Sequence, residues 1–128
     1  MFGGPNPNLC VRYLEQQRIA PLYFRVSVDG HLQFVETSSE TAKVSAPDSL
    51  NFDHEDYFIV ESMIDANFNH VFVSYGLEWK GTWAAGLWVK GIYPNIQSYP
   101  GVYYVLHWLD SNSNGIPETG EITTVASG

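Results

Sequence analysis

Oxygen-bearing side chains recur at alternate positions in one stretch of this sequence, residues 110–121. With Asp110 counted as position 1, Asn112 and Asn114 stand at positions 3 and 5, and Gly115 follows at position 6. A main-chain carbonyl at position 7 and carboxylates at positions 9 and 12 complete a spacing with which twelve-residue loops surround a hard cation. The stretch therefore predicts a Ca²⁺ site whose ligands all come from one loop: Asp110, Asn112, Asn114, the Ile116 carbonyl, Glu118 and Glu121.

The composition of this loop also suits a simple hairpin turn, because Asn, Ser and Gly are the residues that turns favour. Sequence alone leaves both interpretations open. If a cation binds, we expect a structural and not a catalytic ion, since a single loop supplies every ligand.

A strand is expected directly before the loop. Residues 101–109 are mostly β-branched and aromatic, and Pro100 marks their start. This arrangement differs from an EF-hand, in which a helix precedes the cation loop.

The segment 98–121, SYPGVYYVLHWLDSNSNGIPETGE, resembles the late strand and calcium loop of bacterial and archaeal surface domains with Ig-like or transthyretin-like folds. Its loop is also similar to dockerin and thrombospondin-type calcium repeats. The resemblance implies a β-sandwich, Ca²⁺ as cofactor, and an extracellular or cell-surface location. The loop departs from the EF-hand pattern at Pro117 and in having Asn112 and Asn114 in place of Asp. Fewer charged ligands imply weak binding, with a dissociation constant of ~0.1–1 mM.

Composition predicts one packed β domain over residues 1–128. Aromatic residues make up 15% of the chain and charged residues 16%, a balance that favours a folded core over disorder. The single cysteine, Cys10, excludes an intrachain disulfide. Residues 1–8 are rich in Gly, Pro and Asn, and we expect them to form a flexible N-terminal segment.

The charge of the chain argues against nucleic acid as a partner. Fourteen acidic residues against six basic ones give a formal net charge of −8, and the six basic residues are scattered along the sequence. No apolar run reaches the ~18 residues that a membrane-spanning helix needs, so no membrane span is expected.

A first hairpin is predicted around Asp29 and Gly30. A three-residue loop, 28–30, would pair Val26 with Leu32 and Phe24 with Phe34, whereas a two-residue loop would mix apolar and polar faces. We therefore expect Gly30 at the left-handed position of a bulged turn.

The same reasoning predicts a second hairpin over residues 71–89, turning at 79–81 with Gly81 left-handed. One of its faces is apolar and is expected to be buried: Val71, Val73, Tyr75, Leu77, Trp83, Leu87 and Val89. On the other face Phe72 would oppose Trp88, forming a flat aromatic patch that could bind a sugar ring or a partner protein. The alternative is that a helix, loop or strand covers this pair.

Further strands are expected at 42–45, 57–64 and 122–126. Residues 9–20 fit either one or two helical turns or an edge strand, and the strand is favoured. The total of seven to nine short strands without a long helix predicts an all-β fold, an antiparallel Ig-like β-sandwich.

No pattern of catalytic residues is recognisable. The four histidines show no metal-binding spacing, no Gly-x-Ser-x-Gly segment occurs, and the acidic residues around 53–61 read as a solvated turn. We therefore expect no catalytic residues.

Taken together, these features predict a non-enzymatic, calcium-stabilised structural or adhesion module, with a protein or glycan partner at a cell surface. One alternative is a carbohydrate-binding module that uses Phe72 and Trp88, with Trp79 or Trp83 near the turn. Another is a small ligand-binding or enzymatic β-barrel. Association with further copies of the chain is left open.

Overall fold

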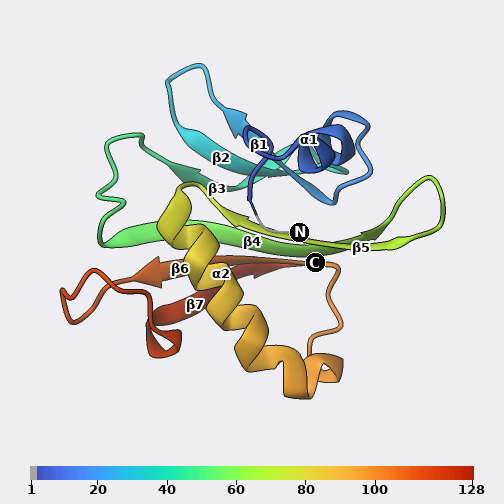
Figure 1. The fold of residues 1–128 in the computed structure, drawn as a ribbon. Coiled ribbons are helices and arrows are strands. Elements are labelled where there is room, and N and C mark those ends of the chain that lie inside the picture. The colour runs from blue at the N-terminus through green and yellow to red at the C-terminus, as the bar shows by residue number, and fades with distance from the viewer. Residues whose placement is uncertain (1–2) are drawn as a thin grey trace.

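The computed structural model describes residues 3–128, which form seven strands in two antiparallel sheets, two α-helices and two short 3-10 helices (Figure 1). The predicted all-β class is thus confirmed at the level of a mostly β chain with two antiparallel sheets. In chain order the elements are α1 (Leu9–Gln16), β1 (Leu22–Val26), β2 (Leu32–Glu36), β3 (Thr41–Ala46), β4 (Glu55–Ile64), β5 (His70–Gly76), α2 (Trp79–Ile92), η1 (Tyr93–Ser98), β6 (Tyr103–Leu109), η2 (Thr119–Glu121) and β7 (Ile122–Ser127).

The first sheet has the order β1-β2-β3, and its first hairpin is as predicted. Val26 pairs with Leu32 and Phe24 pairs with Phe34. Gly30 has a φ of +85°, and its N–H donates to the carbonyl of Ser27, the residue directly before the three-residue loop (3.0 Å). A left-handed glycine at this point allows the turn without the strain of a Cβ atom.

The second sheet has the order β5-β4-β6-β7, and both of its faces are covered (Figure 1). Along its central strand β4, Ile59 and Met63 point toward the first sheet, while Phe58 and Val60 point toward α2. Alternate side chains of a strand lie on opposite faces, so a strand covered on both sides contributes apolar side chains to both. β4 and β6 therefore form the centre of the molecule.

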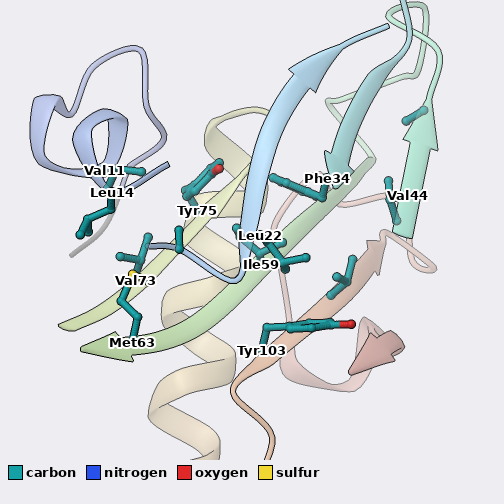
Figure 2. Close-up of a cluster of buried hydrophobic side chains, with 13 residues drawn as sticks. Val11, Leu14, Leu22, Phe34, Val44, Ile59, Met63, Val73, Tyr75 and Tyr103 are labelled. Atoms are coloured by element: carbon teal, nitrogen blue, oxygen red, sulfur yellow. The ribbon is translucent and has the colours of Figure 1, made fainter. Parts of the chain in front are cut away.

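A cluster of buried side chains fills the space between the two sheets (Figure 2). Phe34 from the first sheet meets Tyr75 from the second edge-to-face, with ring centroids 5.5 Å apart. Helix α1 closes one end of this cluster with Val11 and Leu14. The remaining buried members come from five strands and the turn before β1: Ala20, Leu22, Val44, Ala46, Ile59, Met63, Val73, Tyr103 and Val105.

The prediction of a strand within residues 9–20 was wrong, because this segment begins with helix α1. The Asn8 side chain accepts hydrogen bonds from the N–H groups of Cys10 (3.0 Å) and Val11 (3.2 Å), so it caps the helix. The preceding residues 3–7 are in contact with the body of the protein, for example through the Gly3 N–H bonded to Ser74 O. Residues 1 and 2 of the predicted flexible segment lie outside the described residues.

The second predicted hairpin was also wrong, because residues 79–92 form helix α2 and not a return strand. The face of α2 against the sheet carries Gly81, Ala84, Ala85, Trp88 and Val89, which is helical spacing. Apolar residues also stand at alternate positions along 83–89, a pattern that fits a strand as well as a helix. For this reason the pattern of this segment did not distinguish the two structures. The expectation of an all-strand fold without a long helix fails for the same reason.

Small residues on α2 let the helix approach the sheet closely. A Cβ atom on Gly81 would lie 2.5 Å from Asp56 Oδ2 and 2.8 Å from Gly76 Cα. Gly81 is therefore required for close packing and not for a left-handed conformation, which it does not adopt. Trp83, which was expected in the core, is 43% exposed.

Candidate functional site

The predicted cation loop begins where β6 ends, and its first residue is firmly fixed. The Asp110 side chain is inaccessible to solvent. Its Oδ2 atom accepts the N–H of Gly115 (2.7 Å) and its Oδ1 atom accepts the N–H of Asn114 (3.2 Å). His54 Nδ1 lies 2.5 Å from the same Oδ2 atom. Gly115 has a φ of +71°, which places a glycine where the chain turns back on this carboxylate.

The next two predicted ligands point into the same turn. Asn112 Oδ1 accepts the N–H of Asn114 (3.1 Å), and Asn114 Oδ1 accepts the N–H of Ile116 (2.8 Å). A carboxamide oxygen has two lone pairs, so each of these oxygens can accept an N–H and also bind a cation. The oxygens at positions 1, 3 and 5 are thereby each bonded to the main chain of the loop itself.

Glu118 meets both asparagines. Its Oε2 atom accepts from Asn112 Nδ2 (2.5 Å) and from Asn114 Nδ2 (3.2 Å). The structure therefore brings together three of the six predicted ligands through direct contacts, and Asp110 joins them through the main chain of Asn114.

Glu121 lies in a different set of contacts. One carboxylate oxygen accepts from Trp108 Nε1 (3.0 Å), and the other accepts from the N–H (2.9 Å) and hydroxyl (3.2 Å) of Ser111. Glu121 thus ties the end of the loop to β6. The partners of its carboxylate are Trp108 and Ser111 and not Glu118, so its role as a cation ligand stays a prediction.

The electrostatics of the loop favour ionised carboxylates. Burial raises the pKa of Asp110, but hydrogen bonds from His54 and two main-chain N–H groups lower it by more, so the pKa lies below its usual range. Burial likewise raises the pKa of Glu121, while hydrogen bonds from Trp108 and Ser111 bring it below the usual value. At neutral pH both groups carry the negative charge that a cation ligand needs.

The loop packs against the first turn of α2 through Lys80. Its side chain is 10% exposed, and Nζ donates to the main-chain oxygen of Asp53 (2.6 Å). A Cβ atom built on Gly115 would lie 3.5 Å from this Nζ. The loop, the turn before β4 and the start of α2 are therefore in mutual contact.

The ligand set suits a hard cation. Among residues 3–128, no three His, Cys, Asp or Glu side chains gather in a metal-binding group. A cation held by this loop would need amide and main-chain oxygens beside its carboxylates, which are ligands for Ca²⁺ and not for Zn²⁺.

The predicted exposed patch of Phe72 and Trp88 does not exist in that form. Phe72 lies on β5 and Trp88 on α2, and both are partly buried in the cluster between the second sheet and the helix. The structure instead agrees with the alternative expectation, in which a helix covers this face of the sheet. Both residues instead line a cavity of about 150 Å³ together with Tyr99 and Tyr104.

The exposed tryptophans are Trp79 and Trp83, one turn apart on α2. They are 62% and 43% exposed, and their rings stack with centroids 6.1 Å apart and planes inclined by 17°. Trp79 also borders a groove of about 460 Å³ whose walls include Phe24 and Thr82.

Two acidic residues that were expected in a solvated turn are buried. Asp56 accepts the N–H groups of Gly81 (2.7 Å) and Glu78 (3.1 Å), so it caps the start of α2 in place of a local residue. Burial raises its pKa to about 7, against the lowering effect of these hydrogen bonds. Glu61 points into the core from the same face of β4 as Ile59, an alternation that could have been read from the sequence.

Glu61 and Glu15 together cover the free edge of β1. Glu61 Oε2 accepts the N–H of Leu22 (2.9 Å) and Glu15 Oε2 accepts the N–H of Phe24 (3.2 Å). Glu15 also accepts a hydrogen bond from the Tyr75 hydroxyl. Burial raises the pKa of Glu15 to about 7 and, with the charge of Glu15 as a further cause, that of Glu61 to about 8.

The histidines lie in separate places. Besides the pair of His54 with Asp110, His107 Nε2 contacts Glu55 Oε1 (2.8 Å), and its ring stacks on Tyr57 with centroids 4.4 Å apart. These contacts explain two of the four histidines as parts of local hydrogen-bond networks.

No protein-family model, no curated protein sequence and no solved structure matches this chain. Within residues 3–128, no helix combines the length and the apolar character needed to cross a lipid bilayer.

Proposed function

We propose that residues 110–121 bind Ca²⁺ and that the chain is a calcium-stabilised, non-enzymatic structural or adhesion module. The observation that carries the proposal is the arrangement of the loop. Its side-chain oxygens at positions 1, 3 and 5 accept hydrogen bonds from main-chain N–H groups of the loop itself. The Glu118 carboxylate accepts a hydrogen bond from the side chain at position 3. These contacts gather several oxygen-bearing side chains within one loop, in keeping with the ligand type that a hard cation prefers.

A cation in the loop would stabilise the fold and would not perform chemistry. The loop joins β6 to β7 and contacts the turn before β4 and the start of α2. An ion that links these segments binds the folded state and not the unfolded chain, and so raises the free energy of unfolding.

The weak affinity expected from two Asn ligands supports an extracellular or cell-surface location, where calcium is present at millimolar concentration. The two sheets share one buried cluster, in keeping with an Ig-like β-sandwich. We therefore also propose that the fold is a variant of that class in which α2 covers the outer face of one sheet.

Thermal unfolding with and without calcium tests the proposal. At a free Ca²⁺ concentration of about ten times the dissociation constant, the folded state gains roughly 1.4 kcal/mol. For a domain of this size the melting temperature should rise by about 3–7 °C relative to excess chelator. The variant Glu118→Gln removes an exposed carboxylate that accepts hydrogen bonds from the two asparagines, so it should fold normally and lose most of the calcium response.

The matched control is Asp29→Asn, an exposed acid in the β1–β2 turn, which should keep the full response. Glu121→Gln separates the two roles of that residue. A lower melting temperature with an unchanged calcium shift would assign Glu121 to fixing the loop, and loss of the shift would assign it as a ligand. A wild-type melting temperature that does not move with calcium would show that the loop is only a turn.

Saccharide binding by Trp79 and Trp83 is a second candidate function. The specific observation is an exposed, stacked tryptophan pair beside a groove, since aromatic faces are a common surface for sugar rings. Binding to an array of immobilised glycans, lost in a Trp79→Ala/Trp83→Ala double variant that remains folded, would support it. An array without signal would exclude it.

A further inference from the structure

A small cavity lies where the C-terminal half of α2 and the segment after it pack against the second sheet. Its aromatic walls come from four different elements or connections: Phe72 from β5, Trp88 from α2, Tyr99 from the segment after η1, and Tyr104 from β6. The volume is about 150 Å³. Apolar cavities of about 150 Å³ in other proteins accommodate a benzene-sized group.

Three of the rings are in contact with one another beside the cavity. The centroids of Trp88 and Tyr99 are 5.4 Å apart, those of Trp88 and Tyr104 also 5.4 Å, and those of Tyr99 and Tyr104 5.8 Å. The ring planes are inclined to one another by 83°, 47° and 69° respectively, so the rings meet edge-to-face or tilted and do not stack. A cation in the cavity would lie beside this group of rings, and cation–π attraction acts within ~6 Å of a ring centroid.

The charges around the cavity favour a cation. None of the described residues that line it is Lys, Arg or His. The whole chain carries a formal net charge of −8, which attracts cationic ligands from solution. The negative faces of aromatic rings then provide a favourable site for a positive charge that has lost its water.

The lining also distinguishes between kinds of cation. Apart from the rings, aliphatic side chains such as Ile92, Ile96 and Val102 make up much of the wall. The hydroxyl of Tyr104 already accepts the N–H of Gly101 (3.0 Å). An ammonium with N–H groups would lose hydrogen bonds to water here, and a sugar would leave its hydroxyls without partners. A quaternary ammonium group has no N–H to satisfy and carries its charge on an apolar surface.

We infer that this cavity binds a quaternary ammonium group of the trimethylammonium type, as carried by choline. The site is separate from the 110–121 loop and does not depend on the proposed calcium function. Free choline and the headgroup of phosphatidylcholine carry the same chemistry, so the test must distinguish them.

The experiment follows the indole N–H signals of the four tryptophans by NMR while choline chloride is added to the full chain. We expect the Trp88 signal to shift in a saturable manner, with a dissociation constant on the order of 1 mM. The neutral isostere 3,3-dimethyl-1-butanol, in which carbon replaces the charged nitrogen, should bind at least about tenfold more weakly. Equal affinity for the two compounds, or no shift with choline, would overturn the inference.

Two variants assign the site. Trp88→Leu should abolish the choline response, and Trp83→Leu, an exposed tryptophan on the same helix, should leave it unchanged. Since Trp88 is partly buried, Tyr99→Ala is a second variant at the edge of the fold, and it should weaken choline binding severalfold without unfolding the chain. Full retention of choline binding in Tyr99→Ala and in folded Trp88→Leu would contradict the site.

Vesicle sedimentation separates the two sources. Wild-type protein that sediments with phosphatidylcholine vesicles but not with phosphatidylglycerol vesicles, and does so less in Tyr99→Ala, would assign a lipid headgroup. Choline binding without sedimentation would support the same cavity and assign a soluble trimethylammonium compound as its ligand.

Discussion

Asp56 and Asp110 are both buried and both accept main-chain N–H groups, yet their surroundings give them different charges. Asp110 has His54 at 2.5 Å, and its pKa lies below the usual range. Asp56 has no cationic partner among its hydrogen bonds, and burial raises its pKa to about 7. Asp110 is therefore suited to a cation site, while Asp56 accepts the main-chain N–H groups at the start of α2.

Removal of the Asp56 side chain should destabilise the protein through the first turn of α2. In Asp56→Ala the buried N–H of Gly81 loses its acceptor, and that of Glu78 loses its own as well. We expect a loss of about 1–3 kcal/mol in the free energy of unfolding, measured by urea denaturation. The control Asp48→Ala, an exposed position, should change it by less than about 0.5 kcal/mol, and equal effects of the two variants would contradict the role of Asp56.

Two glycines of α2 should respond in opposite ways to the same substitution. In Gly81→Ala the new methyl group would lie 2.5 Å from Asp56 Oδ2, so the helix must shift and stability should fall by about 1–3 kcal/mol. A methyl group on Gly91 meets nothing within 4 Å, so Gly91→Ala should stabilise the helix by about 0.5–1 kcal/mol. Thermal unfolding measures both, and a neutral Gly81→Ala would show that the close approach of α2 is not required.

At the scale of elements, the edge of β1 is closed by carboxylates and not by another strand. Glu15 from α1 and Glu61 from β4 accept successive outward N–H groups of β1. An uncovered strand edge can pair with other chains, and two acceptors at this edge prevent it. Glu61 Oε1 has no hydrogen-bond partner among the described residues, and such a buried oxygen costs less free energy in a protonated carboxyl group than in a carboxylate.

Stability should therefore fall as the pH rises. A carboxyl group with a raised pKa in the folded state holds its proton there at pH values at which the unfolded chain has lost it. The pKa values of about 7 for Glu15 and Asp56 and about 8 for Glu61 set the window: stability is greatest near pH 4–5 and declines through pH 8. Each group contributes a slope of at most roughly 1.4 kcal/mol per pH unit within its own window.

Melting temperatures at pH 5.5 and pH 8.5 check this, and Glu61→Gln should reduce the difference between them. Gln keeps an acceptor for the Leu22 N–H and cannot ionise. A wild-type protein that melts at a higher temperature at pH 8.5 than at pH 5.5 would contradict the prediction.

At the scale of the whole molecule, the second sheet is the central layer, with the first sheet on one face and α2 on the other (Figure 1). Each interface has its own buried cluster, and β4 and β6 contribute to both. The apolar residues of these strands therefore pack against a layer on each face of the sheet. No further layer of the chain packs on the outer side of α2 within the described residues.

This layering predicts unequal effects for two large aromatic residues. Phe34 is inaccessible between the sheets, so Phe34→Ala should lower the free energy of unfolding by about 3–5 kcal/mol through the cavity it leaves (Figure 2). Trp83 is 43% exposed on α2, so Trp83→Ala should lower it by roughly 1 kcal/mol or less. Denaturant unfolding measures the loss of stability in both variants. A larger loss in Trp83→Ala than in Phe34→Ala would contradict the placement of α2.

The features that the sequence alone determined are those set by neighbours along the chain. The register of the β1–β2 hairpin follows from alternation of Phe24, Val26, Leu32 and Phe34 around a loop that ends in Gly30. The strand β6 and the spacing of oxygens after it are equally local, because turn and strand preferences act over a few residues.

Only the tertiary structure decided what residues 79–92 become and which charges are buried. The apolar residues of this segment fit both a strand and a helix, and a helix with Gly81, Ala84 and Ala85 is what covers the open face of the second sheet. The burial of Glu61 and the meeting of Trp88 with Tyr104 likewise depend on segments distant in the chain. Contacts of this kind arise from packing between layers, which no pattern within a single segment specifies.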